Sequence, residues 1–446
     1  MRSKDKMISG FSKLGKREKI AWLLKHFFTS NPIEVTREFA SFWHTNEEAQ
    51  NMFDGISENT ITNFYMPFGV APNFLINGKL YCIPMVIEES SVVAAASSAA
   101  KFWSNRGGFH TDIVSTIKSG HVHFMWHGEP YKMFQFFEEI RADLRFGVKD
   151  LTRNMEKRGG GIKAIELLHC PGIEEGYYQI KVDFETCDAM GANFINSVLE
   201  EFGSILKKKA KEYFGSEDKD VNVIMAILSN YTPECLVRAW VECPIEELGN
   251  FPNNISAKEF AYKFNQAIHI ARNDHFRATT HNKGIFNGID AVVIATGNDF
   301  RAIEACGHAY AARDGQYRSL SQCTLEDGKL RFSIEIPLAI GTIGGLTKIH
   351  PLARRSLELL GNPSAEELMS IVATAGLAQN FAAVRSLVTT GIQKGHMKMH
   401  LNNILSHFAA TPKEREFAVA HFSDKLISFT AVREFLTEYR SQQIAW

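Results

Sequence analysis

Four segments of the chain place ionisable side chains among small or turn-forming residues, where a side chain can face a ligand instead of packing into a core. They are Glu88-Glu89-Ser90-Ser91, residues 277–290, residues 295–299 and residues 391–400. In the first, adjacent carboxylates between an apolar strand and an alanine-rich helix would be partly buried. Burial raises the pKa of a carboxylate and suits it to act as an acid catalyst. The alternative is a solvated strand end without a catalytic role.

The second segment crowds cationic and amide side chains together. It contains Arg277, His281, Asn282, Lys283 and Asn287. An arginine can bind a ligand carboxylate through two parallel hydrogen bonds, and a lysine is a movable cation that can stabilise an oxyanion or donate a proton. The segment is therefore either a substrate-binding cluster or an ordinary polar loop.

Two further residues could complete such a site. Asp299 follows small residues after an apolar strand expected at 291–294, so its carboxylate could hold the charge of Lys283, although a helix N-cap explains the same residue type. His396 lies beyond a hinge expected at Gly391. A closing C-terminal flap would carry this histidine to the site, whereas the alternative is a structural histidine.

The sequence lacks the glycine-rich motifs that usually cradle a nucleotide. Neither G-x-G-x-x-G nor G-x-x-x-x-G-K-[ST] occurs. The segment Asp188-Ala189-Met190-Gly191-Ala192-Asn193 instead opens a long helix expected from about 192 to 213. Backbone N–H groups at a helix N-terminus attract phosphate, which makes this segment the candidate contact for a dinucleotide.

Hydrophobic periodicity indicates the elements that must position these residues. An apolar strand from Leu80 to Ile87 leads into the carboxylate turn and then into a helix of small residues. From 115 to 235 the expected order is strand, helix, two strands, helix and strand, which is the split βαβ arrangement of a ferredoxin-like domain. The chain is therefore predicted to mix helices and strands in more than one unit.

Helices are expected at both ends of the chain and before the hinge. The first 50 or so residues show helical spacing, and so does the stripe from Val432 to Tyr439. Ser364-x-x-Glu367 is a capping box that opens a helix, which Gly376 should end. A second helix is expected from about Gln379 to Thr390.

Length and composition exclude several classes of protein. The 446 residues allow roughly two to four domains, and 49 Lys+Arg against 50 Asp+Glu argue against a nucleic-acid partner. No stretch approaches the ~18 apolar residues of a membrane span, and the N-terminus does not resemble a secretory signal. Seven cysteines without a C-x-x-C pair indicate reduced thiols and no cysteine metal site. We therefore expect a cytoplasmic protein without a membrane partner and without a metal cofactor.

Taken together, six motifs in order resemble hydroxymethylglutaryl-CoA (HMG-CoA) reductases of the soluble class II type, from about residue 58 to the C-terminus. The motifs are residues 88–97, 188–193, 278–284, 295–299, 376–380 and 395–397. The family reduces HMG-CoA to mevalonate and CoA with two hydride transfers from a nicotinamide cofactor.

The resemblance implies a role for each matching residue. Glu89 would protonate the carbonyl oxygen during reduction of mevaldehyde, Lys283 would stabilise the oxyanion, and Asp299 would tune that pair. His396 on the flap would protonate the departing CoA thiolate. The residues that match substrate contacts are Ser91, Arg277 and Asn287, and those that match cofactor contacts are Asn230, Gln379 and the 188–193 motif.

The choice of cofactor follows from one position of the resemblance. Family members that use NADH carry an aspartate about seven residues before a Gly-Gly-Gly motif, placed for the adenine ribose. Counting back from Gly159 gives Thr152, with Asp150 nearby. Thr152 lacks a carboxylate that would repel a 2′-phosphate, and cations flank it, so NADPH is favoured over NADH.

The family fold implies an α/β (α+β) architecture. A large α/β substrate and dimerisation domain (1–114 and 236–390) is interrupted by a small ferredoxin-like, non-Rossmann cofactor domain (115–235), and a C-terminal helical flap follows (391–446). The family's active site lies between two subunits, so a homodimer or a higher assembly of dimers is implied.

Two other functions remain open at this point. A NAD(P)H-dependent reductase of another acyl-CoA thioester could use the same scaffold, and Arg277 discriminates because it needs a distal carboxylate. A ligand-sensing or RNA-binding ferredoxin-like module is disfavoured, since residues 115–235 lack an RNP-type aromatic motif and the chain has no basic excess.

Overall fold

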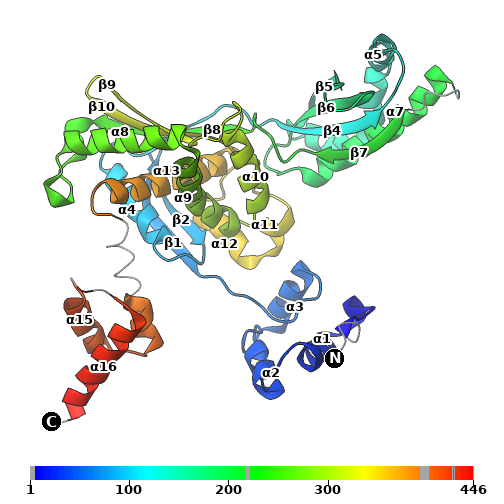
Figure 1. Cartoon of the computed structure of the whole chain (residues 1–446). Coiled ribbons are helices and arrows are strands. Elements are labelled where there is room, and N and C mark those ends of the chain that lie inside the picture. The colour runs from blue at the N-terminus through cyan, green and yellow to red at the C-terminus, as the bar shows by residue number, and fades with distance from the viewer. Residues whose placement is uncertain (1–5, 216–220, 392–400, 424, 426, 445–446) are drawn as a thin grey trace.

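The structure is a computed structural model that describes residues 6–215, 221–391, 401–423, 425 and 427–444. Its buried apolar side chains form three clusters. Figure 1 shows the helices and strands that carry them. The largest cluster has members from Ala71 to Phe109 and again from Cys235 to Val384. The second lies between Val122 and Val221, and the third between Leu401 and Leu436. The chain therefore leaves the large core, builds a smaller one and returns.

The large core combines an antiparallel sheet, a β-hairpin and several helices around α13. The sheet has the strand order β3-β8-β10-β9, and β1 and β2 form a separate two-stranded antiparallel sheet. Helices α4, α8 and α9 pack against α13. The strands are β1 (Phe68–Ile76), β2 (Lys79–Val86), β3 (His110–Ile113), β8 (Leu236–Pro244), β9 (Ser321–Glu326) and β10 (Lys329–Pro337). The helices are α4 (Val92–Ser104), η3 (Ile245–Leu248), η4 (Pro252–Asn254), α8 (Ala257–Asn273), α9 (His275–Ala295), α10 (Phe300–Ala311), α11 (Gly345–Ile349), α12 (Pro351–Leu359) and α13 (Ala365–Val388).

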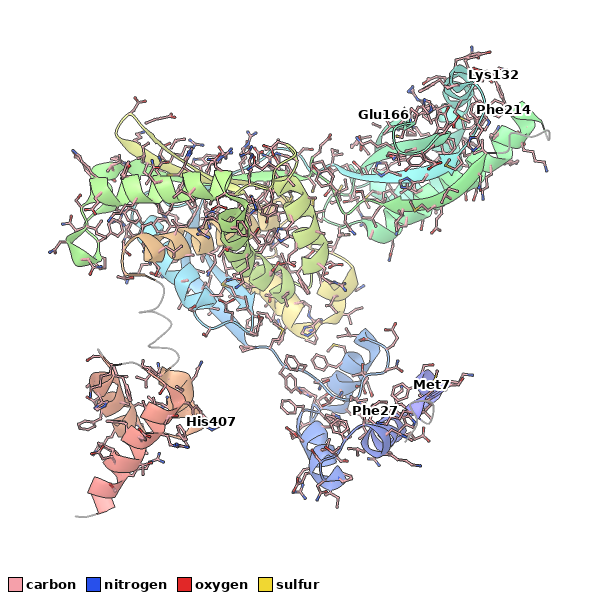
Figure 2. The ribbon with its side chains drawn as sticks, viewed as in Figure 1. Met7, Phe27, Lys132, Glu166, Phe214 and His407 are labelled. Atoms are coloured by element: carbon pink, nitrogen blue, oxygen red, sulfur yellow. The ribbon has the colours of Figure 1, made fainter. Side chains whose placement is uncertain are left out.

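The small unit has the strand and helix order expected of a split βαβ arrangement. Its four antiparallel strands lie in the order β5-β6-β4-β7, so the first strand of the unit sits beside the third. Phe214 at the end of α7 contacts Trp126 and Phe136 and closes one end of the core (Figure 2). The elements are β4 (Lys118–Met125), α5 (Pro130–Gly147), α6 (Lys149–Glu156), β5 (Gly161–His169), β6 (Tyr177–Glu185), α7 (Ala192–Phe214) and β7 (Asn222–Leu228).

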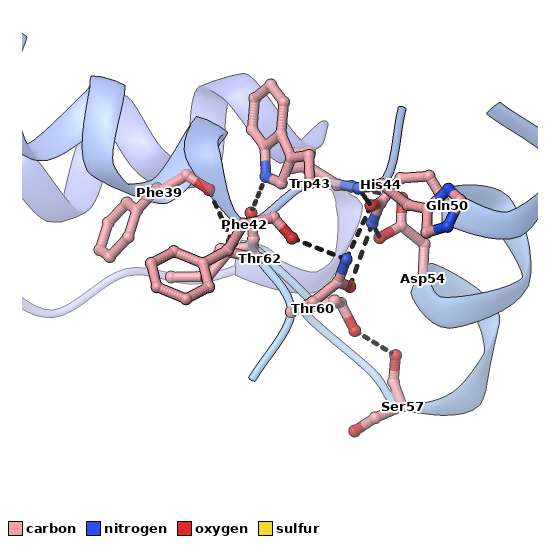
Figure 3. Close-up of polar contacts among 12 residues, drawn as sticks. Phe39, Phe42, Trp43, His44, Gln50, Asp54, Ser57, Thr60 and Thr62 are labelled. Carbon is pink, nitrogen blue, oxygen red and sulfur yellow. Dashed lines mark hydrogen bonds and ion pairs between the residues drawn. The ribbon is translucent and has the colours of Figure 1, made fainter. Parts of the chain in front are cut away.

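The N-terminal segment is helical, as its periodicity indicates. Polar contacts tie the chain after α3 back to the end of α2 (Figure 3). Trp43 Nε1 donates a hydrogen bond to the carbonyl oxygen of Ile61 at 2.9 Å, and Thr62 Oγ1 donates to the carbonyl oxygen of Phe39 at 2.7 Å. The helices are η2 (Phe11–Lys13), α1 (Lys16–His26), α2 (Pro32–Ser41) and α3 (Glu47–Ile56).

The C-terminal segment is also helical and has its own apolar cluster. Thr411 and Glu414 form a capping box at the start of α15 (Pro412–His421). Arg440 of α16 (Phe429–Ile444) reaches the same Glu414 at 2.6 Å, and together with backbone hydrogen bonds from Thr411 this lowers the pKa of Glu414 to about 2. One carboxylate thus joins the two helices.

Residues 277–294 are helical, which corrects the strand expected at 291–294 and rules out the alternative of a polar loop at 277–290. Both segments belong to the single helix α9. Ile285, Ile289 and Val292 are buried at helical spacing, and the polar residues between them occupy the opposite stripe. The apolar run 291–294 resembles a strand in sequence because this end of the helix is buried on most sides.

Gly376 does not end a helix, and α13 continues through it to Val388. A Cβ at this position would lie 2.8 Å from Cγ1 of Ile289, so the glycine permits close approach of α9. The helix also carries an 18-residue window with a mean hydropathy of 1.3, contrary to the expectation that no stretch approaches a membrane span. Because 72 % of that window is buried inside the protein, α13 has the properties of a core helix.

Candidate active site

The centre of the site is an ion pair between two residues that lie far apart in sequence. Glu89 lies in the turn between β2 and α4, and Lys283 lies midway along α9. Lys283 Nζ donates to Glu89 Oε2 at 2.6 Å, with side chains that are 61 % and 37 % exposed. A lysine and a carboxylate in direct contact at an open surface can exchange a proton with a bound substrate.

Ser91 gives the turn beside this pair an uncommon backbone. Its φ of 79° and ψ of −21° place a non-glycine residue in the left-handed region at the N-cap of α4. Such a conformation costs free energy and is found preferentially at functional sites. Its side chain makes no capping hydrogen bond and lines the cavity described next.

A cavity of about 450 Å³ brings together residues from three segments. Arg277, Lys283 and Asn287 come from α9, on which Lys283 and Asn287 lie one helical turn apart on the same face. The remaining predicted residues that line it are Glu89, Ser91 and Gln379. Burial lowers the pKa of Arg277, and its guanidinium makes no ion pair with any described carboxylate. The cavity thus presents an unpaired cation to a ligand.

Gln379 contributes an unsatisfied hydrogen-bond acceptor. The residue is 6 % exposed, and its Oε1 has no hydrogen-bond partner among the described residues. A buried amide oxygen without a donor is costly, so a ligand N–H group would fit here. The carboxamide of a nicotinamide carries such a donor.

His281 and Asn282 serve the structure around the site. His281 Nε2 lies 2.6 Å from Ser321 Oγ, which donates to Asn380 Oδ1, and burial lowers the pKa of this histidine to about 3. Asn282 bonds the main chain at Arg318 and Leu320. The imidazole is therefore neutral at physiological pH and acts as a fixed core group.

Asp299 lies outside this group of residues within the chain. Its carboxylate accepts the backbone N–H groups of Arg301 and Ala302 as the N-cap of α10, and it pairs with the Arg301 guanidinium at 3.3 Å. The helical path from Lys283 to Ala295 alone is about 18 Å long at 1.5 Å per residue. The alternative of a helix N-cap is therefore observed, and no described contact joins Asp299 to Lys283 of the same chain.

The 188–193 segment lies at the N-terminus of α7, as expected. Gly191 is the N-cap with a φ of 92°, and no side chain caps this 23-residue helix. The first backbone N–H groups of α7 therefore remain available to an anion such as a pyrophosphate. Lys118, which is 3 % exposed, holds the preceding turn by donating to Thr186 Oγ1 at 2.5 Å and to the carbonyl oxygen of Ala189 at 3.2 Å.

Asp188 has a structural contact in place of a free carboxylate. Its Oδ1 accepts the backbone N–H of Ala365 at 2.8 Å, and its carbonyl oxygen accepts that of Thr342. A Cβ at Gly341 would lie 2.4 Å from the nitrogen of Met190. The turn before α7 thus lies against the N-terminus of α13, which joins the small unit to the large one.

Two more of the expected cofactor residues have different surroundings. Thr152 is 1 % exposed and its hydroxyl donates to the carbonyl oxygen of Lys149, so it cannot contact a 2′-phosphate directly. Its neighbours Lys149, Asp150 and Arg153 are among the exposed residues of this helix. Asn230 is exposed after β7. His396 lies outside the described residues.

The carboxylic acid Asp290 is not among the site residues predicted from the sequence. It lies two turns beyond Lys283 on the same face of α9, and this spacing could have indicated that it belongs to the site. Burial, followed by the neighbouring Glu304 and Glu88, raises the pKa of Asp290 to about 8. Its Oδ1 has no hydrogen-bond partner among the described residues. The acid is therefore largely protonated at neutral pH.

None of the described residues form a group of three or more His, Cys, Asp or Glu side chains that could hold a metal ion. All seven cysteines are free thiols.

Two known proteins are similar to this chain in sequence. The chain is 39 % identical over 392 residues to the 3-hydroxy-3-methylglutaryl-coenzyme A reductase of Archaeoglobus fulgidus. The matched region covers 87 % of this chain and 86 % of that protein. A probable enzyme of the same name from Borreliella burgdorferi is 33 % identical over 86 % of each chain.

Solved structures show the same similarity. The Streptococcus pneumoniae 3-hydroxy-3-methylglutaryl-coenzyme A reductase has a TM-score of 0.72 at 35 % identity and covers 97 % of this chain and 100 % of its own. A class II structure of that enzyme bound to NADPH has a TM-score of 0.69 at 35 % identity, covering 86 % of this chain and 100 % of its own. The family model for hydroxymethylglutaryl-coenzyme A reductase matches residues 23–401, and the chain belongs to that family.

Proposed function

We propose that this chain reduces HMG-CoA to mevalonate and CoA in two hydride transfers. The observation that carries the proposal is the 2.6 Å pair between Lys283 and Glu89 in a cavity that also holds the unpaired Arg277. The Lys283 ammonium stabilises negative charge as it develops on the thioester or aldehyde oxygen. During reduction of mevaldehyde, Glu89 passes the proton that it shares with the Lys283 ammonium to the aldehyde oxygen, and the Arg277 guanidinium binds the acyl carboxylate.

Ser91 and Asn287 complete the contacts to the acyl group in this proposal. Both line the cavity beside the ion pair, one from the turn before α4 and the other one helical turn beyond Lys283. His396 would protonate the leaving CoA thiolate. That role rests on the family motif alone.

NADPH, when bound, supplies the hydride. The residues fit such a cofactor on two observations: the N-terminus of α7 has no side-chain cap, and Gln379 Oε1 has no donor. The α7 amides would bind the pyrophosphate, and Gln379 would orient the nicotinamide amide. Lys149 and Arg153, which are exposed beside the buried Thr152, are the cations available to a 2′-phosphate.

We propose a homodimer with shared active sites, and the position of Asp299 supports it. A helical path of about 18 Å separates it from Lys283 in one chain, although both belong to the family's motifs. A second copy would supply Asp299 to the first copy's Lys283 and Glu89. Two copies related by a twofold axis then form two equivalent sites.

We place the enzyme in the cytoplasm because all seven of its cysteines are free thiols and the apolar window of α13 is mostly buried. A reductase of another acyl-CoA thioester is the second candidate. It is not favoured, because the relatives reported above are named for HMG-CoA and because Arg277 would then lack an anionic partner.

Turnover of HMG-CoA, monitored by oxidation of NADPH or NADH, tests this function. We expect activity with HMG-CoA, a preference for NADPH, and little activity on an acyl-CoA without a distal carboxylate. Lys283→Ala should lower kcat by roughly 100-fold or more with the fold retained, as for other removed oxyanion donors. The matched control is Lys329→Ala, which breaks an exposed ion pair with Glu242, because neither residue lines the cavity. Equal rates on the two acyl-CoAs would contradict the proposal, and a strong NADH preference would contradict the cofactor.

A further inference from the structure

A second guanidinium lines the substrate cavity near the end of α13. Arg385 is the single charged residue between 368 and 388, in an otherwise apolar or uncharged stretch. Its Nη2 donates to Ser98 Oγ of α4 at 2.8 Å. The guanidinium carbon lies 5.6 Å and 5.5 Å from the ring centroids of Phe102 and Phe381.

No carboxylate neutralises this cation among the described residues. Arg385 has one side-chain hydrogen bond, although a guanidinium carries five N–H donors. Burial lowers its pKa, yet an arginine stays charged at neutral pH. A desolvated cation without a counter-ion is unfavourable, and an anionic ligand would offset that cost.

The other charged groups of the cavity leave Arg385 free for a ligand. Lys283 is engaged by Glu89 at 2.6 Å, and Arg277 is the cation assigned above to the acyl carboxylate. An acyl-CoA substrate carries phosphates in addition to that carboxylate. Both groups match the fork of a guanidinium.

We infer that Arg385 is a second anion-binding residue of this cavity and holds an anionic oxygen of the acyl-CoA, from its carboxylate or from a phosphate of CoA. The inference rests on the proposed function and adds a specificity residue to it. If the side chain only braced α13 against α4 through Ser98 and the phenyl rings, its loss would change stability and leave substrate binding unaltered.

The test is steady-state kinetics of Arg385→Met, which keeps an unbranched apolar stem, and of Arg385→Lys, which keeps the charge without the fork. We expect Arg385→Met to raise KM for HMG-CoA about 10- to 100-fold with a much smaller change in kcat, and Arg385→Lys to fall between. Arg331→Met is the matched control, because Arg331 also lies over an aromatic ring, that of Trp240, outside the cavity. Its KM should equal the wild-type value.

Mevaldehyde distinguishes the two sources of the anion, because it carries the carboxylate but no CoA. If Arg385 binds the carboxylate, KM rises for both substrates, and if it binds a phosphate, KM rises for HMG-CoA alone. An unchanged KM for HMG-CoA in the folded Met variant would overturn the inference. If that variant does not fold, an unchanged KM in Arg385→Lys would do so. Wild-type turnover of HMG-CoA separately tests the proposed function.

Discussion

Gly288 marks the closest approach of the two helices that form the walls of the active-site cavity. A Cβ at this position of α9 would lie 2.5 Å from the carbonyl oxygen of Ala375 and 2.8 Å from Cβ of Gln379, both on α13. Gly284, one turn earlier on the same helix, has no atom of the described residues within 4 Å of its Cβ position. Gly288→Ala and Gly284→Ala therefore make the same chemical change in two different surroundings.

The two substitutions should shift stability in opposite directions. Alanine is favoured over glycine in a helix by about 1 kcal/mol, and Gly284→Ala should gain most of that. At Gly288 the clash is with backbone, so the helices must separate by roughly 1 Å to restore ordinary contact. Overpacking of this kind costs about 1–3 kcal/mol, so Gly288→Ala should lose up to ~2 kcal/mol net.

Thermal unfolding of the large core measures the difference. Each kcal/mol corresponds to about 2–4 °C in a unit of 150–250 residues, so the two midpoints should diverge by several degrees. KM for HMG-CoA should also rise in Gly288→Ala, because Lys283 and Gln379 stand on the helices that separate. A midpoint that rises equally in both variants would refute the close packing of α9 on α13.

Two further predictions concern ionisable groups. Burial beside Glu304 raises the pKa of Asp290 from 3.8 to about 8, so its contribution to stability is full below about pH 4 and is lost as the pH rises through 8. In the wild-type protein the free energy of unfolding should therefore fall by up to about 1.4 kcal/mol per pH unit from pH 5 to 8, and Asp290→Asn should remove this decrease. Unfolding midpoints measured across that range test the prediction, with Asp327→Asn in an exposed turn as the control that should keep the decrease. Equal pH dependence in the two variants would contradict the buried acid. Mixing inactive Lys283→Ala and Asp299→Ala proteins should restore about a quarter of wild-type activity after random reassociation, and no recovery would contradict a shared site.

Strong alternation made the small unit predictable from sequence. Every second residue is buried along β6, and along β4 from Gly120 onward, and turns or long helices separate the strands of the unit. The order of elements therefore followed from local patterns, and the sheet order β5-β6-β4-β7 is compatible with it. The pairing of Glu89 with Lys283, across 194 residues, could not follow from local pattern and came from the family's motifs.

The extents of helices α9 and α13 could not be predicted from the sequence, for a common physical reason. Each is buried on most sides, so neither shows a clean amphipathic period, and each contains glycines that are usually helix breakers. Gly288 of α9 lies against α13, and Gly376 of α13 lies against α9. Each glycine therefore permits close helix packing and does not mark a turn. A single sequence does not distinguish these two uses of glycine.

The same close packing explains why the functional residues look like a polar loop. α9 packs directly against α13, and its apolar residues are covered there. Arg277, Lys283 and Asn287 of α9 line the cavity beside this contact, and Arg385 of α13 lines the same cavity. The sequence around Arg385 contains no motif that indicates ligand binding, because the residues that line the cavity with it belong to other segments. Its proposed role therefore rests on its position in the cavity, whereas Lys283 and Glu89 could be assigned by motif.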